Sequence, residues 1–334
     1  MEIAIDLGTA NVLVAVRGKG IVLREPSVVT VDRNSGKLVA IGEEARQMLG
    51  RTPGSIAAMR PLRDGVIADY EITEAMLRHF IARVTPGRSM TRPRVMICIP
   101  TGATGAERRA VREAAQSAGA GKVELIEEPL AAALGVGLQI TKPEGHMVVD
   151  IGGGTADVAV LTLGGVAASD SVRVGGDAID SVIVQELKST YSLAIGERTA
   201  EEIKIDVGSV HPQGYERQSD IRGRDLLTGL PKTLHISSSD IRPALMEPAR
   251  EIVASVRRVL EMTPPELISD ILDHGIWLTG GGAMLHGLPE LIARETGVPT
   301  HLAEDPMSSV ALGTARALDM QLVSGHLVIF KRVI

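Results

Sequence analysis

Two short segments place an aspartate and a glycine-containing turn between apolar runs. IAIDLGTANVLVAV (residues 3–16) contains Asp6, and MVVDIGGGTADVAVL (residues 147–161) contains Asp150. Glycines let a polyanion approach bare backbone N–H groups, so each turn could bind a phosphate. An aspartate beside a phosphate is unfavourable unless a hard divalent cation lies between them, and Mg²⁺ keeps its waters in such sites. Asp6 and Asp150 are therefore candidate ligands, through water, of one cation.

The two segments differ in the spacing from the aspartate to the next threonine. Asp6 and Thr9 are three positions apart, whereas Asp150 and Thr155 are five positions apart. We therefore expect the second turn to be two residues longer and to wrap the phosphates more closely. Neither segment is a dinucleotide fingerprint or a Walker loop, because strand residues follow the second turn and no Gly-Lys-Ser/Thr is present. One copy alone fits a tight turn with a surface acid equally well, but the duplication favours phosphate binding.

Three further groups could take part in the same chemistry. A glycine cluster beginning at Gly280 follows the strand-like GIWLT and leads into a helix, where backbone can meet a ligand. Glu127 and Glu128 stand at an expected helix start, where carboxylates are stabilised by the helix dipole, and periodicity does not decide whether either faces a cleft. Glu201 and Lys204 lie one helical turn apart, and a solvated ion pair is their simplest interpretation.

The predicted strands and helices that would carry these residues follow one α/β order, and this order occurs twice along the chain. Short strands and hairpins, then alternating strands and helices, extend to about residue 138, and the same order restarts at residue 147. We expect strands at 3–7, 11–16, 27–31, 94–100, 122–126, 147–151, 156–163, 166–174, 275–279 and 299–302, and helices at 72–84, 103–120, 128–138, 177–190, 199–206 and 307–320. This predicts two halves, 1–140 and 141–334, with insertions at about 33–70 and about 181–260, the latter including the segment 207–240.

Composition limits the function classes that need to be considered. The chain has 334 residues, 44% hydrophobic and 23% charged, as expected of a globular protein with two or more domains. With 2% aromatic residues and a formal charge of −6, it is not expected to bind nucleic acid. Cys98 is the sole cysteine, so no internal disulfide is possible, and it is expected to be a buried core thiol. No leader or membrane span is apparent, so a cytoplasmic location is expected.

The assembled motifs resemble a known superfamily. The two aspartate-glycine hairpins, the PLAAALG helix, the LTGGG turn and the closing SVALGTARAL are similar to the five-part signature of the actin, sugar-kinase and heat-shock-chaperone ATPases. More specifically, IDLGTANVLV, GIVLREPSVV, RPLRDGVIADYEITEAML, IGERTAEEIKI and GRDLLTGLPKTL resemble the MreB/Mbl family of bacterial actin homologues across nearly the whole chain. The resemblance implies an actin-like α/β fold, in which two duplicated domains with smaller inserted subdomains surround a nucleotide cleft.

The resemblance also implies binding of ATP or ADP with Mg²⁺ and slow ATP hydrolysis. Asp6 and Asp150 would hold Mg²⁺ through water, and Glu128 and Thr155 would position the attacking water, with Asp157 tuning the site. The phosphates would be held by Thr9, Ala10, Asn11, Gly152, Gly153, Gly154 and Thr155. The adenosine would be met by Glu201, Lys204, Gly280, Gly281, Gly282, Ala283 and Met284.

Family members polymerise head to tail into filaments at the inner face of the cell membrane, where cell-elongation and wall-synthesis proteins are their partners. We expect no amphipathic helix before the first strand, and Met90 and Thr91 stand at the tip of the loop that contacts lipid in some relatives, so a weaker contact is expected. The C-terminal segment 323–334 could contact the membrane or pack as a terminal strand, and we favour packing. The competing hypotheses are a small-molecule (sugar or carboxylate) kinase and, less favoured, a chaperone.

Overall fold

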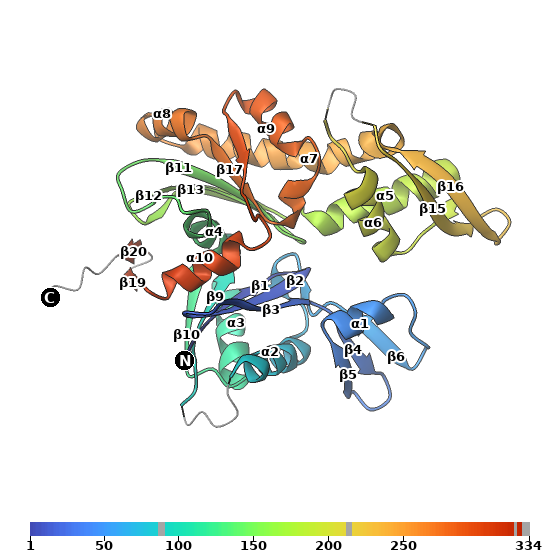
Figure 1. Cartoon of the computed structure of the whole chain (residues 1–334), viewed down its shortest axis with the longest axis horizontal. Coiled ribbons are helices and arrows are strands. Elements are labelled where there is room, and N and C mark those ends of the chain that lie inside the picture. The colour runs from blue at the N-terminus through green and yellow to red at the C-terminus, as the bar shows by residue number, and fades with distance from the viewer. Residues whose placement is uncertain (86–90, 212–215, 324–325, 329–334) are drawn as a thin grey trace.

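The computed structural model describes residues 1–85, 91–211, 216–323 and 326–328, and two five-stranded sheets form its framework (Figure 1). The first sheet has the order β3-β2-β1-β9-β10, and the second has the order β13-β12-β11-β17-β18. In both, the first three strands are antiparallel and the last two run parallel to the central strand. The first consists of β1 (Glu2–Leu7), β2 (Asn11–Val16), β3 (Gly20–Pro26), β9 (Arg94–Ile99) and β10 (Lys122–Glu127). The second consists of β11 (His146–Ile151), β12 (Ala156–Thr162), β13 (Gly165–Val172), β17 (Ile276–Thr279) and β18 (Thr300–Leu302).

Helices cover both sheets, and two of them lie between the sheets. Helices α2 (Tyr70–Val84) and α3 (Gly105–Ser117) bury apolar residues against the outer face of the first sheet, as α7 (Ser238–Met262) and α9 (Leu288–Thr296) do against the second. Helices α4 (Glu128–Val136) and α10 (Ser309–Ala317) lie between the sheets and share one core with residues of both (Figure 1). Burial of these apolar faces is the main stabilising contribution to the framework.

Where α4 and α10 cross, there is no room for a side chain at the crossing residue of either helix. A Cβ atom added to Gly135 would lie 1.8 Å from the carbonyl oxygen of Ser309, and one added to Gly313 would lie 1.6 Å from that of Ala131. Arg316 Nη1 donates to the carbonyl oxygens of Leu134 and Gly135 and so caps the end of α4. The crossing therefore ties a helix of the first half to a helix of the second at backbone-to-backbone distance.

Smaller units are inserted in each half and lie at the right of Figure 1. The first contains β4 (Val29–Asp32), β5 (Leu38–Ile41), α1 (Glu43–Met48) and β6 (Ile56–Met59), followed by the hairpin of β7 (Leu62–Arg63) and β8 (Val66–Ile67). The second contains α5 (Gly176–Tyr191), β14 (Leu193–Ala194), α6 (Glu197–Val207), β15 (Gln218–Asp225) and β16 (Pro231–Ser237). We propose the domain boundary near residue 140, because each large sheet takes all its strands from one side of that position.

Several predicted elements need correction. The strand expected at 27–31 lies at 29–32, and β3 before it was not predicted, because this edge strand is only partly buried and lacks a clear apolar alternation. The long helix α7 was also missed, since Pro243 and Pro248 lie inside it and proline normally ends a helix. The remaining elements are α8 (Pro265–His274), the short 3₁₀ turn η1 (Gly281–Met284), β19 (Gln321–Val323) and β20 (His326–Val328).

Candidate functional site

The two aspartate hairpins have turns of equal size. Leu7 pairs with Val12 in the first hairpin and Ile151 pairs with Ala156 in the second, so four residues lie between the paired positions in each. The prediction that the second turn is two residues longer is therefore wrong. It rested on matching Thr9 with Thr155, whereas the strand register matches Thr155 with Asn11.

Two carbonyl oxygens of each turn accept hydrogen bonds from residues outside it. In the first, Ser27 donates its N–H to Ala10 O (2.9 Å) and its hydroxyl to Gly8 O (2.6 Å). In the second, the N-terminal N–H groups of α5, from Gly176 and Asp177, donate to the carbonyl oxygens of Gly152 (3.0 Å) and Gly153 (2.8 Å). Among the described residues, no acceptor is bound by the N–H groups of the residues at the centres of the turns, which are Thr9, Ala10, Gly153 and Gly154. These donors are available to an anion.

The two turns approach each other closely. A Cβ atom on Gly153 would lie 2.8 Å from Ala10 Cβ, and one on Gly154 would lie 2.7 Å from Thr9 Oγ1 and 2.8 Å from Asp64 Cα. Asp64 belongs to the β7–β8 hairpin, in which the Gly65 N–H donates to Thr9 Oγ1 at 2.9 Å. This hairpin is a third part of the site that the sequence analysis missed, although its Asp-Gly pair is a strong hairpin signal.

The structure distinguishes the two glutamates at the start of α4. The Glu127 carboxylate accepts a hydrogen bond at 2.8 Å from Arg108, which lies on α3. Glu128 is only 9% exposed, and its pKa is raised well above the usual value by burial, followed by the charges of Asp157, Asp150 and Asp6. Glu128 therefore belongs to a group of four acids at the two hairpins, which periodicity alone did not reveal.

Of the other three acids of this group, Asp150 and Asp157 are buried and Asp6 is partly buried. Burial raises the pKa of Asp6 to about 6 and that of Asp150 to about 7. Burial also raises the pKa of Asp157, although hydrogen bonds from the backbone of Thr101 and from the side chains of Thr155 and Ser171 lower it in part. The charged form of each carboxylate is thus disfavoured in the free protein.

This acid group fits a hydrated cation. Arg108 pairs with Glu127, but in the described part of the chain no lysine or arginine pairs with Asp6, Glu128, Asp150 or Asp157. The described residues also include no group of three acidic, histidine or cysteine side chains close enough to hold a metal ion directly. Binding through water, as predicted for Asp6 and Asp150, is consistent with both observations.

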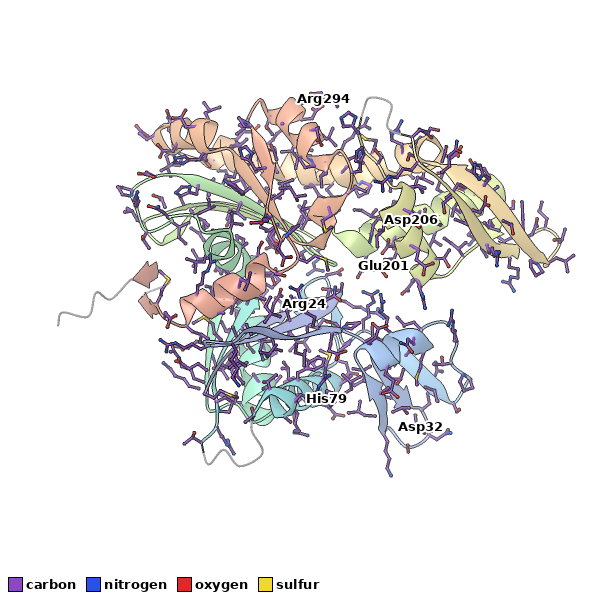
Figure 2. The ribbon with its side chains drawn as sticks, in the orientation of Figure 1. Arg24, Asp32, His79, Glu201, Asp206 and Arg294 are labelled. Atoms are coloured by element: carbon purple, nitrogen blue, oxygen red, sulfur yellow. The ribbon has the colours of Figure 1, made fainter. Side chains whose placement is uncertain are left out.

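Glu201 and Lys204 both lie on α6 but face different partners. Lys204 Nζ lies 2.9 Å from Asp180 Oδ1 and donates to the carbonyl oxygen of Gly176 at 3.2 Å, beside the second turn. Glu201 lies 4.0 Å from Arg46 of the first half, and Figure 2 shows it at the edge of the second half that faces the first. The simple interpretation as a solvated Glu201–Lys204 pair is therefore wrong.

The third glycine cluster closes the β17 end of the site. The Gly280 N–H donates to the carbonyl oxygen of Pro306 at 2.9 Å, and the four residues of η1 follow it. Ala283 is buried, whereas Met284 is 56% exposed. A cleft of about 980 Å³ lies between the halves, with Arg60 and Asp64 on one wall and Asp177 and Asp180 on the other, and its lining does not include the third glycine cluster.

The regions expected to meet a membrane are only partly described. Met90 and most of the segment 323–334 lie outside the described residues, and Thr91 is exposed. Gln321–Val323 and His326–Val328 form a two-stranded hairpin. Within the described ranges, none of the helices combines the length and the apolar character needed to span a bilayer.

Comparisons with known proteins decide the family. The family model described as MreB/Mbl protein matches residues 1–324. The chain belongs to the MreB/Mbl family. It is 55% identical over 318 residues to the cell shape-determining protein Mbl of Bacillus cereus, covering 95% of this chain and 96% of the relative. It is 52% identical over 324 residues to the cell shape-determining protein MreB of Escherichia coli, covering 96% and 93%.

Solved structures agree with this MreB/Mbl assignment. The crystal structure of MreB5 of Spiroplasma citri bound to ADP matches with a TM-score of 0.89 and 40% identity, covering 93% of this chain and 94% of that chain. The MamK double helical filament matches with a TM-score of 0.82 at 21% identity, covering 96% and 100%, and shows the fold alone. The predicted actin-like α/β fold is confirmed.

Proposed function

We propose that this MreB/Mbl chain is an ATP-hydrolysing actin homologue that determines cell shape. Its relatives are named cell shape-determining proteins, and one of them has been solved with ADP and with AMPPNP. The observation that carries the nucleotide site is the meeting of two turns, with free backbone N–H groups, at four buried or partly buried acids. The small-molecule kinase alternative is not favoured by the relatives that match nearly the whole chain.

In this proposal the N–H groups of Thr9, Ala10, Gly153 and Gly154 donate to the phosphates. Asn11, Gly152 and Thr155 complete the two turns, and the Gly152 N–H donates to the carbonyl oxygen of Thr155. Asp6 and Asp150 hold Mg²⁺ through water, and the ion would neutralise phosphate charge. Glu128 accepts a hydrogen bond from the attacking water and orients it, while the hydroxyl of Thr155 fixes its line of approach. The raised pKa of Glu128 would fall once cationic charge enters the site, because the cation favours the carboxylate.

The adenosine is assigned to α6 and the third glycine cluster. Lys204 is oriented by Asp180, and Glu201 faces Arg46 of the opposite half. Gly280, Gly281, Gly282, Ala283 and Met284 provide backbone and apolar surface for the base. A nucleotide between these parts would contact both halves, so its binding would favour their closed arrangement.

We further propose that copies of this chain assemble head to tail into filaments at the inner face of the membrane, with hydrolysis slow and coupled to assembly. An apolar surface supports self-assembly: at the β15–β16 turn, Leu227 is 83% exposed, Leu230 is 64% exposed and Leu226 is 41% exposed. Exposed apolar clusters mark interaction sites, and a heterologous contact between copies repeats without closing. Cell-elongation and wall-synthesis proteins would be the partners of such filaments.

The decisive experiment is filament formation by the whole chain on anionic liposomes, with ATP and Mg²⁺, viewed by electron microscopy. We expect filaments with ATP and none without nucleotide. Leu227→Asp should abolish them, whereas Leu163→Asp, which changes another exposed leucine in a hairpin turn, should not. Phosphate transfer to a sugar or carboxylic acid without any polymer would instead support the kinase alternative.

A further inference from the structure

The two aspartates assigned to the cation are each bound by one side chain from a neighbouring strand. Thr279 Oγ1 on β17 donates to Asp150 Oδ1 at 2.7 Å. Cys98 Sγ on β9 donates to Asp6 Oδ1 at 3.3 Å. Thr279 is fully buried and Cys98 is 2% exposed, so neither is positioned to contact a nucleotide in the cleft.

These two donors occupy equivalent positions in the duplicated sheets. Strand β9 is the parallel neighbour of β1, as β17 is of β11. Thr279 pairs directly with Asp150, and Cys98 comes one residue after Ile97, whose partner Ile5 precedes Asp6. Sequence comparison of the two halves does not reveal this correspondence, because a thiol in one half takes the place of a hydroxyl in the other.

Each donor engages one oxygen of its carboxylate. Among the described residues, no hydrogen bond reaches the other oxygen of either aspartate. A carboxylate fixed through one oxygen presents the other in a defined direction, which is how partners behind a metal site orient its ligands. A hydroxyl is a stronger donor than a thiol, so Asp150 is held more firmly than Asp6.

We propose that Cys98 and Thr279 are a matched pair of positioning residues that aim Asp6 and Asp150 at the hydrated cation. The inference rests on the proposed function and names two residues behind its cation site. Thr279 has the larger effect because its hydrogen bond is shorter, fully buried and made by the stronger donor. Both residues act on the divalent ion through the aspartates and leave the phosphate-binding N–H groups untouched.

The test measures binding of a fluorescent ATP analogue to the whole chain, by Mg²⁺ titration at fixed nucleotide and in EDTA without divalent ion. Thr279→Val removes the hydroxyl at constant shape and should raise the Mg²⁺ concentration for half-maximal binding by about 10-fold or more. Thr279→Ser restores the donor and should stay within about 3-fold of the wild type. Binding in EDTA should be the same for all three proteins.

A second pair of variants keeps the test decisive if Thr279→Val does not fold. Cys98→Ala removes the thiol donor and should raise the same Mg²⁺ concentration by about 3-fold, less than Thr279→Val, while Cys98→Ser retains a donor and should not. An unchanged Mg²⁺ requirement in both Thr279→Val and Cys98→Ala overturns the inference. Equal loss of binding with and without Mg²⁺ also overturns it. If the wild type itself shows no Mg²⁺-dependent nucleotide binding, the proposed function fails.

Discussion

The hairpin β1–β2 and the hairpin β11–β12 have the same strand order, the same turn size and the same aspartate before the turn. They differ in the residue that faces this aspartate across the strands, which is Leu13 opposite Asp6 and Asp157 opposite Asp150. Opposed residues lie on the same face of a sheet, so the second hairpin places two acids where the first places one. Glu128 lies near both acids of the second hairpin, and their charges contribute to its raised pKa.

The difference at this position indicates that the two hairpins have different roles in the site. Each hairpin can offer N–H groups to phosphate and one aspartate to a hydrated ion. The second hairpin alone combines these with Asp157, the hydroxyl of Thr155 and the neighbouring Glu128. The two hairpins therefore share their strand arrangement but differ at the residues assigned to positioning the attacking water.

The largest expected effect is on hydrolysis, through Glu128, the acid that lies near both acids of the second hairpin. Glu128→Ala should slow phosphate release at saturating ATP by about 10²–10⁴-fold, because the attacking water loses its acceptor. ATP binding should be retained and polymers should live longer. Glu127→Ala is the matched control, since Glu127 pairs with Arg108, and it should keep near-normal turnover. Wild-type turnover in Glu128→Ala would exclude this glutamate from the reaction.

A smaller effect should follow from exchanging the central residues of the two turns. The strand register makes Gly154 the counterpart of Ala10. Gly154→Ala places a Cβ atom against Thr9 and Asp64, so the parts of the site must move apart at an overpacking cost of about 1–3 kcal/mol, and ATP binding should weaken. Ala10→Gly makes the reverse change without any clash and should alter the affinity little. Isothermal titration calorimetry measures both, and equal losses would contradict the asymmetric packing of the turns.

The smallest effect is the difference between two aspartate variants in how stability depends on pH, about 1.4 kcal/mol, in the absence of nucleotide and divalent ion. Folding raises the pKa of Asp150 from 3.8 to about 7 and that of Asp6 from 3.8 to about 6. Above pH 4 the unfolded chain releases these protons first, so the free energy of unfolding should fall as pH rises to the folded pKa, by about 1.4 kcal/mol per pH unit for each group. Asp150→Asn should remove the part of this decline that extends to pH 7, and Asp6→Asn the part that ends near pH 6, while the contributions of Glu128 and Asp157 remain. Urea unfolding from pH 4.5 to 7.5 tests the difference, and identical profiles would show that the hairpins do not differ.

The strands that carry the site could be predicted from the sequence, but the residue-by-residue correspondence between the two hairpin turns could not. Apolar runs ending in aspartate and glycine marked β1, β2, β11 and β12 correctly, because alternation and turn residues are local signals. The correspondence between the turns was mispredicted because the similar motifs Thr-Ala-Asn and Thr-Ala-Asp do not occupy equivalent positions. When the two hairpins are matched by strand register, the second motif is shifted by two residues relative to the first. The choice between Glu127 and Glu128, and the contact of Cys98 with Asp6, depend on packing between distant segments and have no local signature.

The crossing of α4 and α10 sets which motions the molecule can make. Gly135 and Gly313 hold the two helices at backbone contact, so the sheets cannot be drawn apart there without losing the packing of both helices. A rotation of the two halves about this contact would preserve the packing of both helices. In such a rotation the displacement grows with distance from the α4–α10 contact, so the small sheets at the right of Figure 1 would move furthest. A fluorescence pair on β6 and α6 would therefore report opening of the cleft with a large signal, whereas a pair on α4 and α10 would remain nearly silent.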